Sequence, residues 1–215
     1  MTVDTVSLFL ALLAVVAEIA TLVAVVLVVG GRFSPALRRL RQQAVEAVSP
    51  SALSLAAVVA AVCMGGSLYF SEVANFPPCK LCWYQRYAMY PLVPILAVAA
   101  WKNSTRVRLP ASALAAIGSM VSVYHVLIER GVVQESTSCD PTNPCSLIWV
   151  DRLGYLTIPA MALSGFLLIL TLLAISRAGD RLESIDSELP PGDGGCPPDR
   201  GGVSRQRKGE VHGLR

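Results

Sequence analysis

The sequence predicts an all-α integral membrane protein, a bundle of transmembrane helices. Of its 215 residues, 53% are apolar and 15% are charged, and the mean hydropathy is +0.55, whereas roughly 25% of the residues of soluble proteins are charged. The charges are uneven as well, because 14 of the 33 charged residues lie at positions 177–215. This composition excludes an ordinary soluble domain and a chain disordered throughout. The net charge of +3 gives a nucleic-acid partner little support.

Five apolar segments are long enough to cross the hydrocarbon core, which takes about 20 helical residues. They are residues 6–29, 51–70, 83–101, 111–128 and 158–176. None alternates with the period of two that a barrel strand requires. The first, which carries Glu18, is predicted to be a retained helix rather than a signal peptide, because no Lys or Arg precedes it and its apolar run is longer than an h-region. The third is interrupted by Arg86, Pro91 and Pro94.

Lys and Arg residues gather in alternate connections, and this asymmetry predicts the orientation. Loop 31–50, loop 102–110 and the start of the tail contribute Arg32, Arg38, Arg39, Arg41, Lys102, Arg106, Arg108, Arg177 and Arg181, whereas the other two connections contribute Lys80, Arg86, Arg130 and Arg152. We therefore expect the N-terminus outside the cell and the C-terminus in the cytoplasm. Residues 177–215 are rich in Pro, Gly and charge, which predicts a disordered cytoplasmic tail.

Four of the six cysteines form two closely spaced pairs in the two outer connections. Cys79 and Cys82 form a C-x-x-C, and Cys139 and Cys145 form a C-x5-C. Three accounts compete: two structural staples, one zinc site with four thiolates, and a relay that passes electrons through mixed disulfides. Short loops gain little from a disulfide, and an oxidising compartment disfavours a thiolate metal site. Two pairs on one membrane face favour the relay.

The residues around the first pair support a relay. Pro77-Pro78 cannot continue a helix, so the third span is predicted to start at or just after Cys79, with Cys82 in the first turn, where the helix dipole favours a thiolate. Arg86 follows one turn deeper, and an Arg inside the bilayer is a candidate for a functional site; the alternative is that it extends to the headgroups. No haem, flavin or nicotinamide motif is present, which favours a two-electron carrier dissolved in the membrane as the acceptor.

Six segments in this order resemble the DsbB family of disulfide-formation membrane proteins, and most of all its BdbC-type branch. They are SLYFSE (67–72), PPCKLCWYQR (77–86), MYPL (89–92), YH (124–125), C…PC (139 and 144–145) and LTIPAMAL (156–163). The resemblance covers residues 51–176. It implies a four-helix transmembrane bundle of DsbB type, preceded here by one extra N-terminal transmembrane helix. The domains are then residues 1–50 (extra helix and cytoplasmic loop), 51–176 (redox core) and 177–215 (tail).

The resemblance also implies an activity: a quinone-dependent oxidoreductase that generates protein disulfides in exported proteins at a bacterial cytoplasmic membrane. Cys79–Cys82 would be the pair coupled to quinone (menaquinone or ubiquinone), with Cys82 as the thiolate that meets the ring and Arg86 beside it. Cys139–Cys145 would re-oxidise an extracytoplasmic thioredoxin-like dithiol oxidase of DsbA or BdbD type. By analogy, Cys139 receives the partner's attack and Cys145 exchanges with the first pair. No metal is expected.

His125 is weakly matched to a polar residue that lines the quinone site, and a structural hydrogen-bonding role is the alternative. Two features depart from the family pattern: the extra N-terminal span, and the six-residue spacing of Cys139 and Cys145, which fits the BdbC-type branch better. A vitamin K epoxide reductase-like protein is the alternative family, but there the loop pair precedes the C-x-x-C. A membrane protein with inert structural disulfides is the non-catalytic alternative.

The predicted orientation can be tested by labelling. A membrane-impermeant thiol reagent applied to intact, reduced cells should modify the four paired cysteines and spare Cys196, because the tail is predicted to lie inside. Modification of Cys196 from outside would overturn the orientation and with it the relay.

Overall fold

The computed structural model describes residues 2–135, 139 and 143–188, with side chains through Ser184. Five long helices cover the five predicted spans: α1 (Val3–Gly30), α3 (Ala52–Leu68), α4 (Lys80–Lys102), α5 (Arg108–Glu129) and α6 (Ile158–Glu188). A turn of π-helix, η2 (Tyr69–Val73), extends α3. In this described part of the chain, four helical segments are long and apolar enough to cross a membrane, and α4 is not one of them. The all-α membrane class is confirmed.

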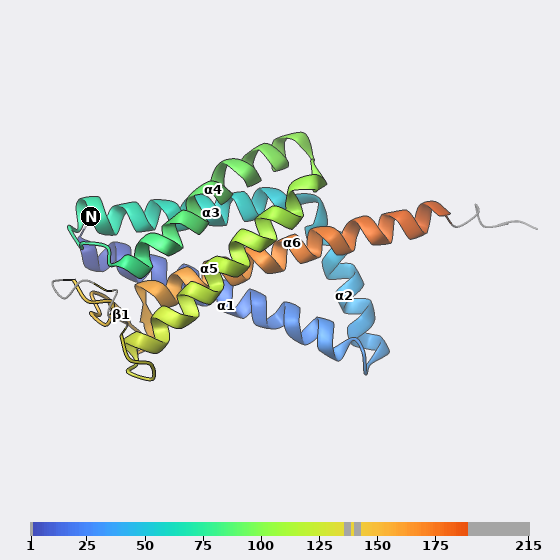
Figure 1. Ribbon diagram of the computed structural model, residues 1–215. Coiled ribbons are helices and arrows are strands. Elements are labelled where there is room, and N and C mark those ends of the chain that lie inside the picture. The colour runs from blue at the N-terminus through green and yellow to red at the C-terminus, as the bar shows by residue number, and fades with distance from the viewer. Residues whose placement is uncertain (1, 136–138, 140–142, 189–215) are drawn as a thin grey trace, which may run out of the picture.

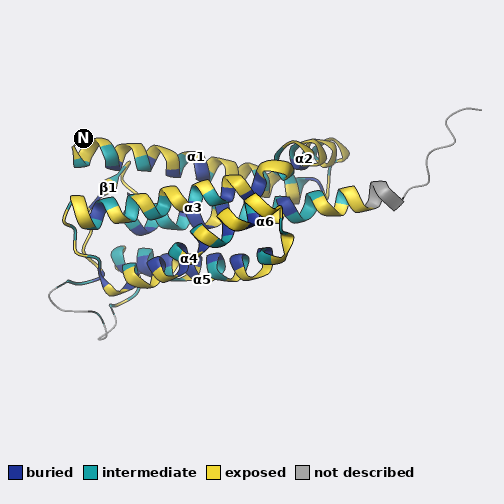
Figure 2. Ribbon diagram, turned by 90° about the horizontal axis from the view of Figure 1, so that it is seen from above, coloured by how far each residue is buried: buried dark blue, intermediate teal, exposed yellow. Residues whose placement is uncertain are grey.

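Helices α3, α4, α5 and α6 form a closed four-helix bundle, and α1 packs against α6 from outside it (Figure 1). The bundle core is made of small and aliphatic side chains, among them Ala56, Ala60, Leu92, Leu96, Ile169 and Leu173. Phe166 is fully buried and lies against Gly118 of α5, where a Cβ atom would approach the ring to 2.3 Å. Seen from above, α1 runs along one side of the bundle with mostly exposed residues (Figure 2). The apolar exposure of α1 is what a lipid-facing helix requires.

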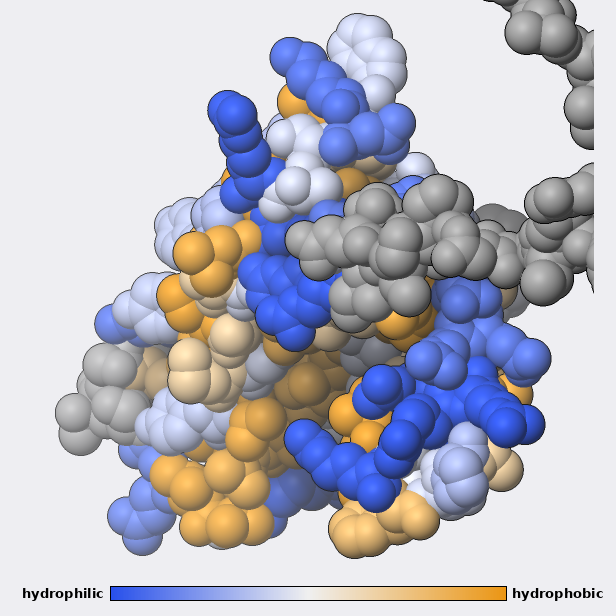
Figure 3. Space-filling view, turned by 90° about the vertical axis from the view of Figure 1, so that its right-hand side faces the viewer, coloured by the Kyte–Doolittle hydropathy of each residue, from blue (hydrophilic) through white to orange (hydrophobic). Residues whose placement is uncertain are grey.

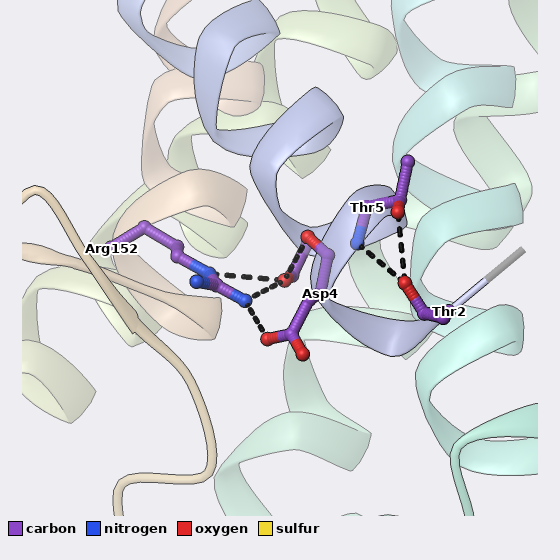
Figure 4. Close-up of polar contacts among 5 residues, drawn as sticks. Thr2, Asp4, Thr5 and Arg152 are labelled. Atoms are coloured by element: carbon purple, nitrogen blue, oxygen red, sulfur yellow. Dashed lines mark hydrogen bonds and ion pairs between the residues drawn. The ribbon is translucent and has the colours of Figure 1, made fainter.

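Two polar contacts hold α1 to the rest of the molecule. The half-buried Glu18 accepts hydrogen bonds of 2.8 Å from both Ser164 of α6 and Tyr155. Near the start of α1, Arg152 forms an ion pair with Asp4 and donates to the Ser7 hydroxyl at 2.8 and 3.1 Å (Figure 4). A carboxylate in a membrane helix is expected to face a protein partner rather than lipid, and Glu18 does so.

One end of the bundle is hydrophilic. Figure 3 looks onto the end where α2 (Pro35–Val48) and the α4–α5 connection lie, and hydrophilic residues gather there. The 3₁₀ turns η1 (Ser49–Ser51) and η3 (Thr105–Val107) complete this end. The predicted loop 31–50 is therefore largely helical. Pro35 is suited to the first helical position, and Val45 packs into the molecule.

Helix α6 continues past the predicted span end at residue 176. Residues 177–188, placed in the predicted disordered tail, are helical. Arg108, 7% exposed, donates from both terminal nitrogens to the Asp180 carboxylate, and this bidentate pair fixes the additional turns against α5. Residues 189–215 lie outside the described residues, and with them Cys196 and most of the predicted tail.

The opposite end carries both cysteine pairs and a small hairpin. Strand β1 (Asp151–Arg152) pairs antiparallel with β2 (Leu156–Thr157), with Asp151 opposite Thr157. The turn uses Leu153 and Gly154, both with positive φ. Because Leu156 and Thr157 are buried, the hairpin fixes the chain where it enters α6, and it places Arg152 beside α1.

Removing the Glu18 carboxylate should loosen α1. Glu18→Gln keeps the size but replaces one acceptor oxygen by a donor, so a charge-assisted hydrogen bond worth about 1.5–3 kcal/mol is weakened or lost. We expect a lower unfolding midpoint for the detergent-solubilised protein. Glu46→Gln, an exposed carboxylate on α2, is the matched control and should be silent. Equal midpoints for both variants and the wild type would show that Glu18 does not anchor α1.

Candidate functional site

The C-x-x-C lies at the first turn of α4, as predicted. After Pro77-Pro78, Cys79 takes an extended conformation (φ −69°, ψ 173°) as the residue that caps α4, and its Sγ accepts from the backbone N–H of Cys82 at 3.4 Å. The Cys79 thiol also donates to Cys82 Sγ at 3.3 Å. The Cys79 sulfur thus accepts a hydrogen bond from an N–H group of the first turn and donates one to the Cys82 sulfur.

The hydrogen bond between the two thiols shifts their pKa values in opposite directions. Cys82 precedes the predicted span 83–101, and the hydrogen bond from Cys79 lowers its pKa, helped by the charge of Arg86 against the opposing effect of burial. The same hydrogen bond, together with burial, raises the pKa of Cys79 to about 12. Cys82 is therefore the member of the pair that ionises more readily to the thiolate, the form that is nucleophilic.

The second pair is held by Glu135. Cys139 and Cys145 have their Sγ atoms 2.7 Å apart, and the Glu135 carboxylate accepts from the Cys145 backbone N–H and, at 2.9 Å, from the Ser146 hydroxyl. Burial, the contact with Cys145 and the nearby Glu135 raise the pKa of Cys139 to about 12, and burial raises that of Cys145. Cys145 is fully buried, whereas Cys139 is half-exposed.

The two pairs meet in one cluster. Cys79 and Cys145 are buried together with Leu81 and Ile128, and Cys82 and Cys139 pack against them. The Nε2 atom of His125 lies 3.6 Å from Cys79 Sγ and 3.1 Å from the Cys145 carbonyl oxygen. His125 therefore lies between the two pairs, although it is 46 residues from Cys79 in the sequence. Exchange between two pairs needs this proximity.

A second polar contact ties the loop to the first pair. Asn143 donates from its side-chain nitrogen to the Pro77 carbonyl at 3.1 Å. Neither Asn143 nor Glu135 was identified from the sequence, because Asn143 bonds to the Pro77 carbonyl, and Glu135 to the Cys145 N–H and the Ser146 hydroxyl, and no residue pattern marks these partners.

Arg86 points into the bundle. It is 8% exposed, its Nε and Nη2 donate to the Ser67 hydroxyl and carbonyl of α3, each at 2.9 Å, and its guanidinium lies 5.2 Å from the centroid of the Trp83 ring. The alternative in which Arg86 extends to the headgroups is not the arrangement observed. A cation is instead placed one turn from Cys82 inside apolar surroundings, where its charge is felt most strongly.

A cavity of about 310 Å³ lies beside Cys82 and Arg86. Side chains of α1, α3, α4 and α6 line it, and most of them are apolar, as is usual for small-molecule sites. They include Leu13, Ala17, Cys63, Phe70, Met89 and Met161. Cys82 thus contributes to both the cysteine cluster and the cavity. His125 is not among the cavity-lining residues; with Cys79, Cys82 and Glu129 it borders a second, much smaller space.

A zinc site of the kind considered above would have all four thiolates around one ion. In the described part of the chain, the groups close enough to share an ion are two separate sets of three, Cys79 with Cys82 and His125, and Cys139 with Cys145 and Glu135. Each pair has its own third neighbour, so the arrangement differs from a single Cys₄ site.

These features define a class: a multi-pass membrane protein of helical bundle architecture with two adjoining cysteine pairs, as in thiol–disulfide oxidoreductases. The sequence profile of the family described as disulfide bond formation protein DsbB matches residues 49–143. Disulfide bond formation protein C of Bacillus subtilis is 43% identical over 128 residues, which are 59% of this chain and 91% of that protein. A probable disulfide formation protein of Oceanobacillus iheyensis is 44% identical over 117 residues, 54% of this chain and 81% of the relative.

The chain belongs to the DsbB family of disulfide bond formation proteins. The BdbC-type resemblance is confirmed by these relatives, and the vitamin K epoxide reductase-like alternative is not supported by them. No solved structure matches the chain.

The asymmetry of the C-x-x-C predicts a pH dependence. With the other four cysteines replaced by Ser, alkylation of Cys82 should have its midpoint below the ordinary thiol value of about 8.5, because its pKa is lowered. As the pH falls through this midpoint the thiolate is protonated and the rate declines. Cys79→Ala removes the hydrogen bond and should move the midpoint upward. Peptide mass spectrometry resolves Cys82 from Cys79, and a parent midpoint at or above the ordinary value would contradict the assignment.

Proposed function

We propose that the protein re-oxidises an extracytoplasmic thioredoxin-like dithiol oxidase (DsbA- or BdbD-like) and passes the electrons to a membrane quinone, menaquinone or ubiquinone. In this proposal α1 is a fifth membrane span, the N-terminus and the cysteine end face outward, and the C-terminus lies in the cytoplasm. The observation that carries the proposal is the position of Cys82, which packs in the cluster of both cysteine pairs and also lines an apolar cavity together with Arg86.

The first exchange takes place at the loop pair. A thiolate of the partner attacks Cys139, the half-exposed member, and Cys145 leaves as a thiolate. The partner's second thiol then displaces Cys139, so the partner gains a disulfide, and the loop pair gains two electrons. Attack at Cys139 is supported by its exposure and by the burial of Cys145 next to Cys79.

The second exchange takes place inside the cluster. The Cys145 thiolate attacks Cys79 of the Cys79–Cys82 disulfide, and Cys82 leaves. Cys139 then attacks Cys145, which restores the loop disulfide and releases Cys79. Cys82 is the better leaving group because a sulfur with a lower pKa leaves faster, and its pKa is the lowered one.

The residues around the cavity fit a quinone head group. The lining is largely apolar, Cys82 presents a thiolate at its edge, and the Arg86 cation lies one turn deeper. A quinone supplies an acceptor of two electrons and two protons, which equals what the Cys79–Cys82 dithiol releases when its disulfide re-forms. Arg86 favours the thiolate by its charge and offers N–H donors to a carbonyl oxygen. His125 holds the loop against Cys79 during exchange.

Single Cys→Ser variants test the division of labour by trapping the redox state of each pair. With a reduced thioredoxin-like dithiol oxidase as substrate, Cys139→Ser and Cys145→Ser should stop oxidation of the partner but leave the C-x-x-C oxidisable by added menadione. Cys82→Ser should abolish electron transfer to menadione.

Cys63→Ser is the matched control, since Cys63 lines the same cavity but belongs to neither pair, and it should remain active. Two outcomes would contradict the proposal: undiminished transfer to menadione in Cys82→Ser, or oxidation of the partner by a variant without the loop pair.

A further inference from the structure

Helix α2 lies across the hydrophilic end of the molecule rather than along the bundle. In Figure 1 it runs across the direction of α3 and α6, and in Figure 2 it is seen nearly end-on. A turn at residues 31–34 separates it from α1, whose apolar residues 6–29 are numerous enough to cross the hydrocarbon core. Because the headgroup region begins where such a span ends, α2 would lie along the membrane surface.

The two ends of the molecule differ in charge. At the α2 end, residues 31–50, 102–110 and 177–184 contain nine Lys and Arg residues against three Asp and Glu residues. At the cysteine end, residues 2–5, 71–82, 129–135 and 143–157 contain three Lys and Arg residues against five Asp and Glu residues. The α2 end is therefore strongly cationic, and it is suited to an anionic partner.

Three arginines of this end, Arg32, Arg38 and Arg39, are exposed. None of the ion pairs among the described residues involves them. The tail does not supply a matching negative charge, because residues 185–215 contain five Lys and Arg residues and five Asp and Glu residues. The three arginines are thus available to anions outside the protein.

Apolar side chains are exposed at the same end. Phe33, in the turn before α2, is 86% exposed, Leu40 of α2 is 50% exposed, and Trp101 at the end of α4 is 85% exposed. Aromatic residues at the ends of membrane spans typically lie at the level of the headgroups. A helix that combines exposed cationic and apolar side chains is typical of segments that lie in an anionic membrane interface.

We propose that α2 and the turn before it bind the headgroups of anionic phospholipids. The three arginines pair with the phosphate groups, for which the planar guanidinium is suited because it can donate two parallel hydrogen bonds. Phe33 and Leu40 contact the acyl chains next to those headgroups. The match to the DsbB family begins at residue 49, so this surface belongs to the segment that precedes the family region. It is independent of the chemistry proposed for the cysteines.

Arg32→Gln/Arg39→Gln removes two of the charges. It keeps Arg38, whose Nε donates to the Gly31 carbonyl at 3.3 Å and holds the turn. Native mass spectrometry of the purified full chain in detergent measures the binding of phosphatidylglycerol, with phosphatidylcholine of the same acyl chains as the neutral reference. The wild type should prefer phosphatidylglycerol. The double variant should bind it about fivefold more weakly for each arginine removed and bind phosphatidylcholine as before.

Two variants separate the charge from the fold of α2. Arg32→Lys/Arg39→Lys keeps both charges and should keep most of the preference for phosphatidylglycerol. Gln42→Ala/Gln43→Ala changes two exposed, uncharged side chains of α2 and should bind as the wild type does. If either of these variants lost as much affinity as the Gln variant, the effect would belong to the folding of α2, and the role of the charges would be overturned.

Three other results would contradict a membrane-binding surface. They are equal affinity of the wild type for the two lipids, unchanged phosphatidylglycerol affinity in Arg32→Gln/Arg39→Gln, and binding of glycerol 3-phosphate as tight as that of phosphatidylglycerol. The last would reveal a site for a free phosphate compound, since glycerol 3-phosphate has the charge of the headgroup without acyl chains. Each of these results would leave the proposed function standing.

Discussion

The site depends on where α4 begins. Pro77-Pro78 prevents an earlier start, and the Cys79 sulfur caps the helix by accepting from the Cys82 N–H. Each residue of an α-helix turns by about 100°, so a start one residue away would rotate Cys82 and everything deeper on α4 out of the cavity. The same sulfur also makes the two thiols unequal, because the Cys79 thiol donates a second hydrogen bond to Cys82 Sγ. Local backbone geometry and redox chemistry thus share one sulfur atom, that of Cys79.

The loop pair depends on that same start. Asn143 bonds to the Pro77 carbonyl, and His125 reaches both Cys79 and the Cys145 carbonyl. These contacts attach a loop to the rigid first turn of a helix without a continuous secondary structure between them. They involve single hydrogen bonds, each worth about 0.5–1.5 kcal/mol, which is weak enough for the loop to separate in the proposed exchange between a partner protein and Cys139.

The sequence predicted the parts whose signals are local. Apolar length located all five helices, and Pro77-Pro78 located the start of α4. The end of α6 was misplaced, because the Arg108–Asp180 pair that extends it joins residues 72 apart, and α2 was taken for a loop. The sequence predicted a ring-binding site beside Cys82 and Arg86, where the cavity lies, but not the part of the cavity wall that α1 supplies. It exists because α1 packs beside the bundle, and the contacts that place α1 there, from Glu18 to Ser164 and from Arg152 to Asp4, span about two thirds of the chain.

If the cavity holds a quinone, as proposed, its size determines how the binding free energy is shared between protein and lipid. About 310 Å³ accommodates a ring system but not a complete isoprenoid tail, whose remainder would stay in the bilayer. As a fifth span, α1 would present its exposed Leu, Val and Ile side chains to that lipid. The membrane itself then provides most of the transfer free energy of a long-tailed quinone, since each buried CH₂ contributes about 0.8 kcal/mol. The protein has to distinguish only the head group. Occupancy would accordingly follow the mole fraction of quinone among the lipids rather than its concentration in water.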